Sequence, residues 1–209
     1  MATIRLYMTV SLDGYVAGPQ DTAENPLGIG GFRLFNWLDL RDEPGPSGQV
    51  YAEALATRAV IAGRRTFELA GRWGGDHHDG VPILVLTHDV PDESPPGSAR
   101  YVTDVRDCAA QAEAAAGDGD VLVHGTGAAQ ALLCAGALDE LELHVVPVLL
   151  GHGRRLFDDL PPEHVELDLV RRLSTEDGTP AQRVVHLRYR VGRGGGLSPA
   201  RSAPPAGTP

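Results

Sequence analysis

Two glycine-containing turns in the sequence have residue types that bind phosphate groups. The first, Gly63-Arg64-Arg65-Thr66, follows a buried-strand pattern and precedes a helical one. Free amide groups at a helix start, beside arginine side chains, can bind a phosphate. A glycine turn followed by two solvated arginines is the alternative interpretation, and a motif this short does not decide between them.

The second turn, His124-Gly125-Thr126-Gly127-Ala128-Ala129, also lies between a strand pattern and a helical pattern. It shares glycines with the dinucleotide fingerprint, but Gln130 stands at the sixth position and no acidic residue follows about twenty positions on. The sequence therefore argues against a Rossmann domain. A pyrophosphate site at the helix start and a glycine needed only for the turn both remain open.

Acidic, histidine and cysteine residues give weaker signals. Asp13, in Ser11-Leu12-Asp13-Gly14, can be a proton carrier, a hydrogen-bond acceptor for a substrate or a turn residue, which is the commonest role of an Asp-Gly pair. Asp76-His77-His78-Asp79 lies among glycines, and adjacent side chains point apart, which favours a solvated loop over a metal site. Cys108 and Cys134 lie on apolar stripes of helices and are interpreted as core residues. We predict no metal site.

The hydrophobic pattern places these turns between alternating strands and helices. It predicts strands at 4–10, 59–62, 82–86, 101–103, 120–123, 140–149, 165–170 and 183–191. It predicts helices at 32–38, 50–57, 105–116 and 128–135, and a helix start within 63–68. This order indicates a mixed α/β sheet covered by helices, with an antiparallel part at the C-terminal end. We expect one domain at 1–191 and a disordered tail, rich in Gly, Pro and Ala, at 192–209.

Composition excludes several classes of protein. The 209 residues include 28 acidic and 18 basic side chains, and the net charge of −10 opposes contact with nucleic acid or an anionic membrane. No apolar run is long enough to span a membrane. Two separate cysteines exclude a disulfide scaffold and a zinc ribbon, and they fit a reducing, cytoplasmic location.

Four segments together carry a family resemblance. They are Met8-Thr9-Val10-Ser11-Leu12-Asp13-Gly14, Gly63-Arg64-Arg65-Thr66-Phe67, Leu138-Asp139-Glu140-Leu141 and Pro147-Val148-Leu149-Leu150-Gly151-His152-Gly153-Arg154-Arg155-Leu156-Phe157. In this order they resemble the dihydrofolate reductase-like superfamily, and in particular the reductase domain of bacterial riboflavin biosynthesis and its stand-alone relatives. The resemblance implies a three-layer α/β fold with a central, mixed and mostly parallel sheet, antiparallel C-terminal strands and helices on both faces. It also implies NADPH as the hydride donor.

The resemblance also implies roles for particular residues. Gly63, Arg64, Arg65 and Thr66 would lie on the side of the adenosine 2′-phosphate. The other implied cofactor contacts are Leu86, Thr87 and His88 beside the adenine and its ribose, Gly125, Thr126, Gly127 and Ala128 at the pyrophosphate, and Val16 and Ala17 at the nicotinamide. His124 and Thr126 depart from the family pattern, because glycines are usual there. Asp13 and Asp39 are the candidate catalytic residues, as stand-ins for the family's acidic proton donor.

The functional hypothesis is an NADPH-dependent oxidoreductase that transfers a hydride to a small heterocyclic or carbonyl compound, such as a pterin or a ribosylaminopyrimidine. An NADPH-binding sensor or interaction module without turnover is the alternative. Two lone cysteines cannot supply the Cys-x-x-Cys pair of a zinc-dependent deaminase, so a stand-alone reductase is expected. Residues 19–50 should shape the substrate side. The apolar segment from strand 140–149 to Phe157 predicts a homodimer, without nucleic-acid or membrane partners.

Overall fold

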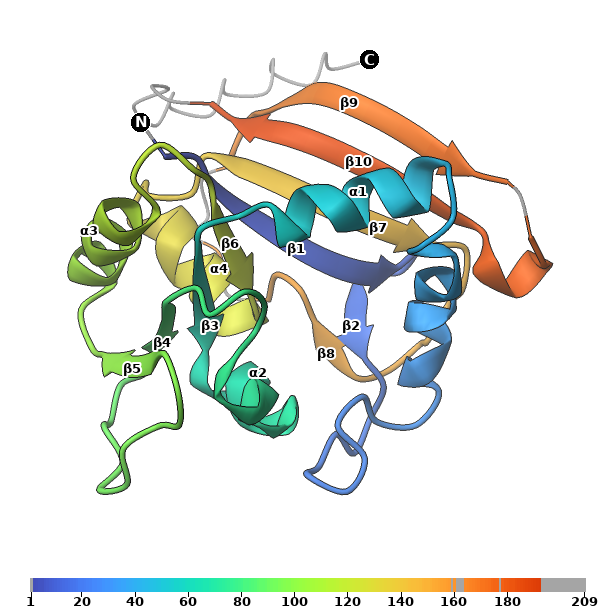
Figure 1. Ribbon diagram of the computed structural model, residues 1–209. Coiled ribbons are helices and arrows are strands. Elements are labelled where there is room, and N and C mark those ends of the chain that lie inside the picture. Colours follow the sequence, from blue (N-terminus) through green and yellow to red (C-terminus); the bar gives the residue numbers. More distant parts are fainter. Residues whose placement is uncertain (1, 159, 161–163, 177, 193–209) are drawn as a thin grey trace, which may run out of the picture.

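An eight-stranded sheet forms the centre of the protein in the computed structural model, which describes residues 2–158, 160, 164–176 and 178–192. The spatial order of its strands is β5-β4-β3-β6-β1-β7-β10-β9, and β2 and β8 form a separate two-stranded sheet (Figure 1). The strands are β1 (Ile4–Ser11), β2 (Tyr15–Ala17), β3 (Ala59–Gly63), β4 (Ile83–Leu86), β5 (Ala99–Val102), β6 (Val121–His124), β7 (Glu140–Val146), β8 (Arg154–Arg155), β9 (Leu167–Thr175) and β10 (Val184–Val191). The tail predicted at 192–209 lies, apart from Gly192, outside the described residues.

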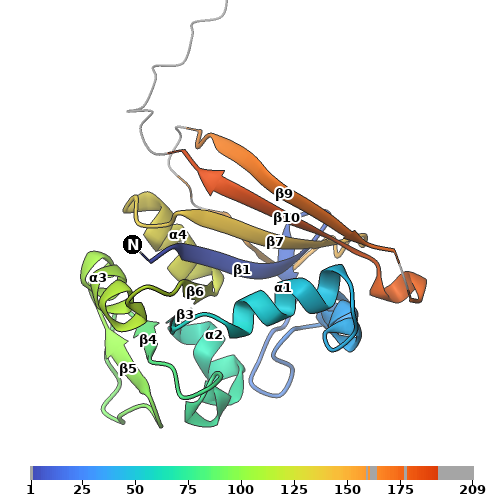
Figure 2. The ribbon, with the colours of Figure 1, turned by 45° about the horizontal axis from the view of Figure 1, so that its top comes forward.

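Helices cover both faces of this sheet, as expected (Figures 1 and 2). The α-helices are α1 (Pro46–Leu55), α2 (Arg64–Leu69), α3 (Val105–Ala116) and α4 (Thr126–Cys134), and the 3-10 helices are η1 (Gly31–Leu40), η2 (Gly71–Gly75) and η3 (Pro180–Gln182). Buried residues of α3 and α4 pack on one face, with Ile4 and Leu6 of β1. Residues of α1 and α2 pack on the other, where Phe67 is fully buried. Because successive side chains of a strand point to opposite faces of the sheet, neighbouring residues pack against different helical layers.

The predicted mixture of parallel and antiparallel strands is confirmed. β1 lies at the centre and pairs in parallel with β6 and β7, so that Leu6 is opposite both Val123 and Leu141. β10 then pairs antiparallel with β7 and with the edge strand β9. β7 is thus paired on both sides, while Leu149, just after it, is 69% exposed.

Several element boundaries differ from those expected. Helix α1 begins at Pro46, not at Val50, because proline fits the first turn of a helix and does not interrupt it there. The short pair β2–β8 was not predicted, since it depends on contact between segments about 140 residues apart.

Cys108 is buried as predicted, but Cys134 is exposed in the last turn of α4, so its interpretation as a core residue is wrong.

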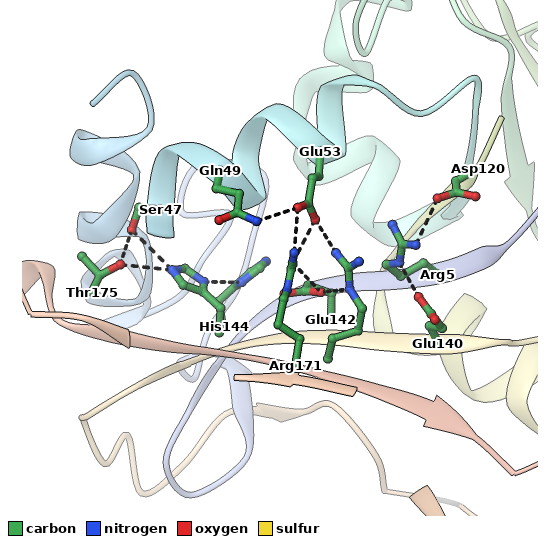
Figure 3. A network of polar contacts seen from close by, with 12 residues as sticks. Arg5, Ser47, Gln49, Glu53, Asp120, Glu140, Glu142, His144, Arg171 and Thr175 are labelled. Atoms are coloured by element: carbon green, nitrogen blue, oxygen red, sulfur yellow. Dashed lines mark hydrogen bonds and ion pairs between the residues drawn. The ribbon is translucent and has the colours of Figure 1, made fainter. Parts of the chain in front are cut away.

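A polar network lies between α1 and the sheet (Figure 3). Glu53 of α1 accepts hydrogen bonds from Arg171 of β9 and Arg188 of β10, and both arginines also bond the fully buried Glu142 of β7. Burial opposes ionisation of Glu53, but the two guanidinium groups outweigh it and lower its pKa to about 2. Two carboxylates thus balance two guanidinium groups, and α1 is fixed to β7, β9 and β10 by charge-assisted bonds.

The same layer holds a pair of buried histidines. The Nδ1 atoms of His144 and His186 lie 2.8 Å apart, and His186 Nε2 faces the hydroxyl groups of Ser47 and Thr175. Trp37 of η1 packs on both imidazole rings and donates to Thr9 Oγ1 over 3.2 Å. This packing fixes η1 against β1. In the part of the chain that the structure describes, no helix has the length and apolarity that a membrane crossing requires.

Candidate functional site

The two glycine turns singled out in the sequence lie against each other at the carboxyl ends of β3 and β6. A Cβ atom added to Gly125 would lie 2.5 Å from Thr66 Oγ1 and 3.4 Å from the backbone nitrogen of Gly63. Gly125 also has φ +97°, which only glycine adopts readily. A Cβ atom on Gly63 would contact the backbone nitrogen of Ala128 at 3.5 Å. The fold thus builds one cradle, which we define as residues 63–66 and 125–128.

Gly127 differs from Gly125 because the fold does not require a glycine there. Its φ is outside the left-handed region, and a Cβ atom would meet nothing within 4 Å. Ala129 is the first α4 amide that bonds back within the helix, to the carbonyl of Gly125 at 3.0 Å. The amides of Thr126, Gly127 and Ala128 precede the first bond within α4, and of the three residues Gly127 is exposed whereas Ala128 is buried. A helix start that is open at Gly127 suits an anionic group that approaches the backbone closely.

Arg64 and Arg65 point in different directions. Arg64 donates to Glu68 Oε1 at 2.8 Å and to the carbonyl of Asp89 at 3.2 Å. Thr87 Oγ1 donates to the same carbonyl at 2.8 Å. Arg64 therefore lies beside the end of β4, where Leu86 precedes Thr87 and the exposed His88 follows it. Arg65 instead turns towards Asp21. The structure therefore brings Arg64 together with residues 86–88, and separates its side chain from that of Arg65.

Asp13 is held by hydrogen bonds that stabilise its ionised form. It accepts from Ser11 Oγ at 2.6 Å and from the amides of Leu150 and Gly151 at 3.1 and 2.8 Å. These bonds, that of Ser11 foremost, lower the pKa of Asp13 to about 2. Of the three roles open to it, this geometry supports the turn role, because the carboxylate accepts from the protein's own groups, and gives no support to a proton carrier at neutral pH.

The other sequence candidates lie in different surroundings. Val16 and Ala17 are buried in β2, which pairs with β8. Asp39 is exposed on η1 and accepts a hydrogen bond from Gln182 at 3.4 Å, so its contacts are with η3 and not with the cradle. The structure therefore does not bring Asp13 and Asp39 together at one site.

A histidine chain that sequence reasoning missed adjoins the cradle. His124 Nδ1 donates to the carbonyl of Tyr7 at 3.1 Å, its Nε2 lies 3.1 Å from His77 Nε2, and His77 Nδ1 lies 2.7 Å from His78 Nδ1. Burial lowers the pKa of His77 to about 4 and that of His124 to about 3. The interpretation of residues 76–79 as a solvated loop is therefore wrong for both histidines. Within the described residues no group of His, Cys, Asp and Glu could hold a metal ion.

Backbone strain occurs in the segment that carries this chain. Arg72 and Trp73 have φ of 54° and 46°, a region that side-chain-bearing residues seldom adopt. The Trp73 ring packs edge-on against His77 at 4.7 Å and tilted against His124 at 5.8 Å. Strain of this kind persists where packing imposes it, and here it holds an aromatic side chain beside the end of β6. The run Trp-x-x-x-His-His was the only sequence signal for it.

This fold, with two glycine turns at the carboxyl ends of β3 and β6, is a dihydrofolate reductase-like fold. Residues 76–179 match the family model of the RibD C-terminal domain. No match was found among the curated proteins.

Three solved structures illustrate the likeness. A protein from Shewanella sp. PV-4 named for riboflavin biosynthesis has 22% identity and a TM-score of 0.66, over 92% of this chain and 100% of that one. The dihydrofolate reductase of Enterococcus faecalis, complexed with NADP(H) and RAB-propyl, has 15% identity and a TM-score of 0.63, over 91% and 97%. A pyrimidine reductase-like protein of Corynebacterium diphtheriae has 13% identity and a TM-score of 0.62, over 92% and 93%.

Proposed function

We propose that the protein is a reductase that uses NADPH to transfer a hydride to a small heterocyclic or carbonyl compound. The observation that carries this proposal is the cradle, in which Gly125 must be glycine for the fold, whereas Gly127 has no structural need to be glycine. A glycine that the fold does not need is expected where a ligand approaches the backbone. NADPH, when bound, would supply the hydride.

The residues of the cradle fit a dinucleotide. The amides of Thr126, Gly127 and Ala128 at the start of α4 would hold the pyrophosphate, and Arg64 or Arg65 the 2′-phosphate. Val16 and Ala17 would border the nicotinamide and exclude water from it, since both are buried in β2.

The proton that accompanies the hydride has no side-chain donor among Asp13 and Asp39. Asp13 is ionised and bonded to two amides, and Asp39 is exposed near η3. Under the reductase hypothesis the proton donor is therefore neither of these two carboxyl groups. The same observation favours a second candidate function, an NADPH-binding sensor without turnover. Oxidation of NADPH, measured against pterins, ribosylaminopyrimidines, quinones and ketones, separates the two: a melting shift with NADPH but no oxidation with any of them supports the sensor.

NADPH is expected to bind at least tenfold more tightly than NADH. A protein of net charge −10 attracts a phosphate only through local cations, and an arginine–phosphate contact contributes about 1.5–3 kcal/mol. Arg64→Ala or Arg65→Ala should remove most of the preference without weakening NADH binding. Fluorescence titration at fixed salt measures both affinities. Arg41→Ala, which removes an exposed arginine distant in sequence, is the control; an equal affinity for both cofactors in the wild type would refute this assignment.

We also propose that the protein is a homodimer, formed through β9. β9 is an edge strand whose Leu167, Leu169 and Val170 are 39–56% exposed. An apolar edge strand with free backbone groups can pair with its counterpart about a two-fold axis. Light scattering at micromolar concentration should give about twice the chain mass of 22.1 kDa, and Leu169→Arg should halve it. A wild-type mass near 22 kDa would contradict the proposal.

A further inference from the structure

A loop that the functional assignment does not use reaches over to the cradle. Residues 19–28, which we call the finger, leave β2 and return to η1. The neck of the finger is closed by bonds from the Gly18 amide to the Leu27 carbonyl and from the Ile29 amide to the Pro19 carbonyl. A Cβ atom on Gly18 would overlap the Ile29 carbonyl, so the neck is packed backbone to backbone.

Asp21 fixes the finger to two arginines from different elements. Its carboxylate accepts from Arg154 of β8, with Nε–Oδ2 at 3.0 Å, and lies 3.0 Å from Arg65 Nη2 of α2. The same Arg65 nitrogen donates to the backbone carbonyl of Asp21 at 2.6 Å. Among the described residues, the hydrogen bonds that residues 20–26 make outside the finger are those of Asp21.

This arrangement is an anion site filled by the chain's own carboxylate. Only 14% of the Asp21 side chain is exposed, against 51% for Arg65 and 38% for Arg154. Burial opposes its ionisation, but Arg154 and Arg65 outweigh it and hold the pKa of Asp21 below its usual range. Gln20, just before it, has φ 61°, so the backbone is strained where the carboxylate turns inward.

We propose that Arg65 and Arg154 form a binding site for a phosphate monoester, and that Asp21 is a tethered competitor which this phosphate displaces. A phosphate monoester carries about −1.5 to −2 charge and three acceptor oxygens, against one charge and two oxygens for a carboxylate. It can therefore satisfy both guanidinium groups at once, and its arrival releases the tip of the finger. Arg155 does not take part, because it bonds the Asp13 carbonyl and the Tyr15 hydroxyl.

The proposal deepens the proposed function and rests on it only for the source of the phosphate. That source is either the 2′-phosphate of the dinucleotide or a phosphate on the substrate. Both place the same group against the same arginines, and ligands without nicotinamide distinguish them: adenosine 2′,5′-bisphosphate stands for the first and ribose 5-phosphate for the second.

The test measures the affinity of these two ligands by calorimetry at fixed salt. A competitor that occupies the site nine-tenths of the time weakens binding about tenfold, so Asp21→Asn should tighten the ligand that uses the site about five- to tenfold. Arg154→Gln should weaken that ligand at least tenfold. Asp42→Asn and Arg41→Gln, which change an exposed ion pair by the same chemistry, are the matched controls and should change neither affinity.

A second measurement follows the finger in the unmodified protein. Glu24 is exposed in it, and cleavage there by a glutamate-specific protease should become faster when the effective phosphate is added. A phosphate that bound elsewhere would leave this rate unchanged or lower it. Unchanged affinity of Asp21→Asn for both ligands, or an equal gain in Asp42→Asn, would overturn the proposal even if NADPH is oxidised. A gain with ribose 5-phosphate would support it even if NADPH does not bind.

Discussion

Gly127→Val is expected to weaken NADPH binding about a hundredfold while the protein stays folded. No atom of the protein lies within 4 Å of the Cβ position, and the backbone there is open to any residue, so the side chain itself causes no clash. The added methyl groups would instead occupy the space in which the pyrophosphate approaches the start of α4. A hundredfold loss corresponds to about 2.7 kcal/mol.

The controls for this substitution separate binding from folding. Gly127→Ala should show a smaller loss of affinity together with a melting temperature that is unchanged or raised, because alanine stabilises a helix by about 0.5–1 kcal/mol over glycine. Ala131→Val places the same bulk one turn later on α4 and should leave affinity unchanged. Cofactor titration and thermal melting measure the outcome. Wild-type affinity in Gly127→Val would show that the cofactor, if any, does not use the cradle.

The free energy of unfolding is expected to fall steeply as the pH drops from 6.5 to about 4. Burial lowers the pKa of His77 and His186 to about 4 and that of His124 to about 3. Each folded-state pKa lies below the unfolded value, so the folded protein keeps these rings neutral while the unfolded chain protonates them. Their contribution is complete above pH 6.5 and is lost as the pH falls towards the folded-state pKa.

The expected effect is a large part of the stability of an ordinary domain. A shift of this kind corresponds to up to about 3 kcal/mol for one histidine, against a usual total stability of about 5–15 kcal/mol. Thermal melting at pH 7.5, 6.0 and 5.0 should show a progressive loss, and unfolding at pH 5 should take up roughly two to three protons, measured by calorimetry in buffers of different ionisation enthalpy. His152→Gln, at an exposed position, should not alter the profile. A melting temperature that is constant between pH 7.5 and 5.0 would contradict the buried, neutral histidines.

The sequence predicted those parts of the fold that depend on local signals. Short apolar runs predict the strands of the sheet. A glycine followed by a helical pattern predicts the turns at 63–66 and 124–128 and the helices that follow them. The predicted boundaries differ from the observed ones by a few residues where one residue type can have two roles. Pro46, for example, can end one segment or begin a helix.

The parts that sequence reasoning missed depend on distant partners. Asp21 meets Arg65 and Arg154, which are 44 and 133 residues away, and no local pattern marks such a meeting. The rule that adjacent side chains point apart failed for His77 and His78, whose Nδ1 atoms lie 2.7 Å apart. That rule assumes regular backbone, whereas the strained turn at Arg72 and Trp73 precedes them. No local pattern marks Glu53 of α1 and Glu142 of β7, which share Arg171 and Arg188 as partners only in the folded protein.

The central place of β1 has a consequence for how the chain acquires its structure during synthesis. Ile4–Leu6 pair with Val121–Val123, and β1 pairs along its length with residues 140–146. β1 thus leaves the ribosome more than a hundred residues before either of its neighbours, and the chain must be made as far as β7 before the middle of the sheet can close. Contacts of such long sequence separation slow folding. Until they form, β1 has two free edges, and a nascent chain that ends before residue 121 has no means of covering either of them.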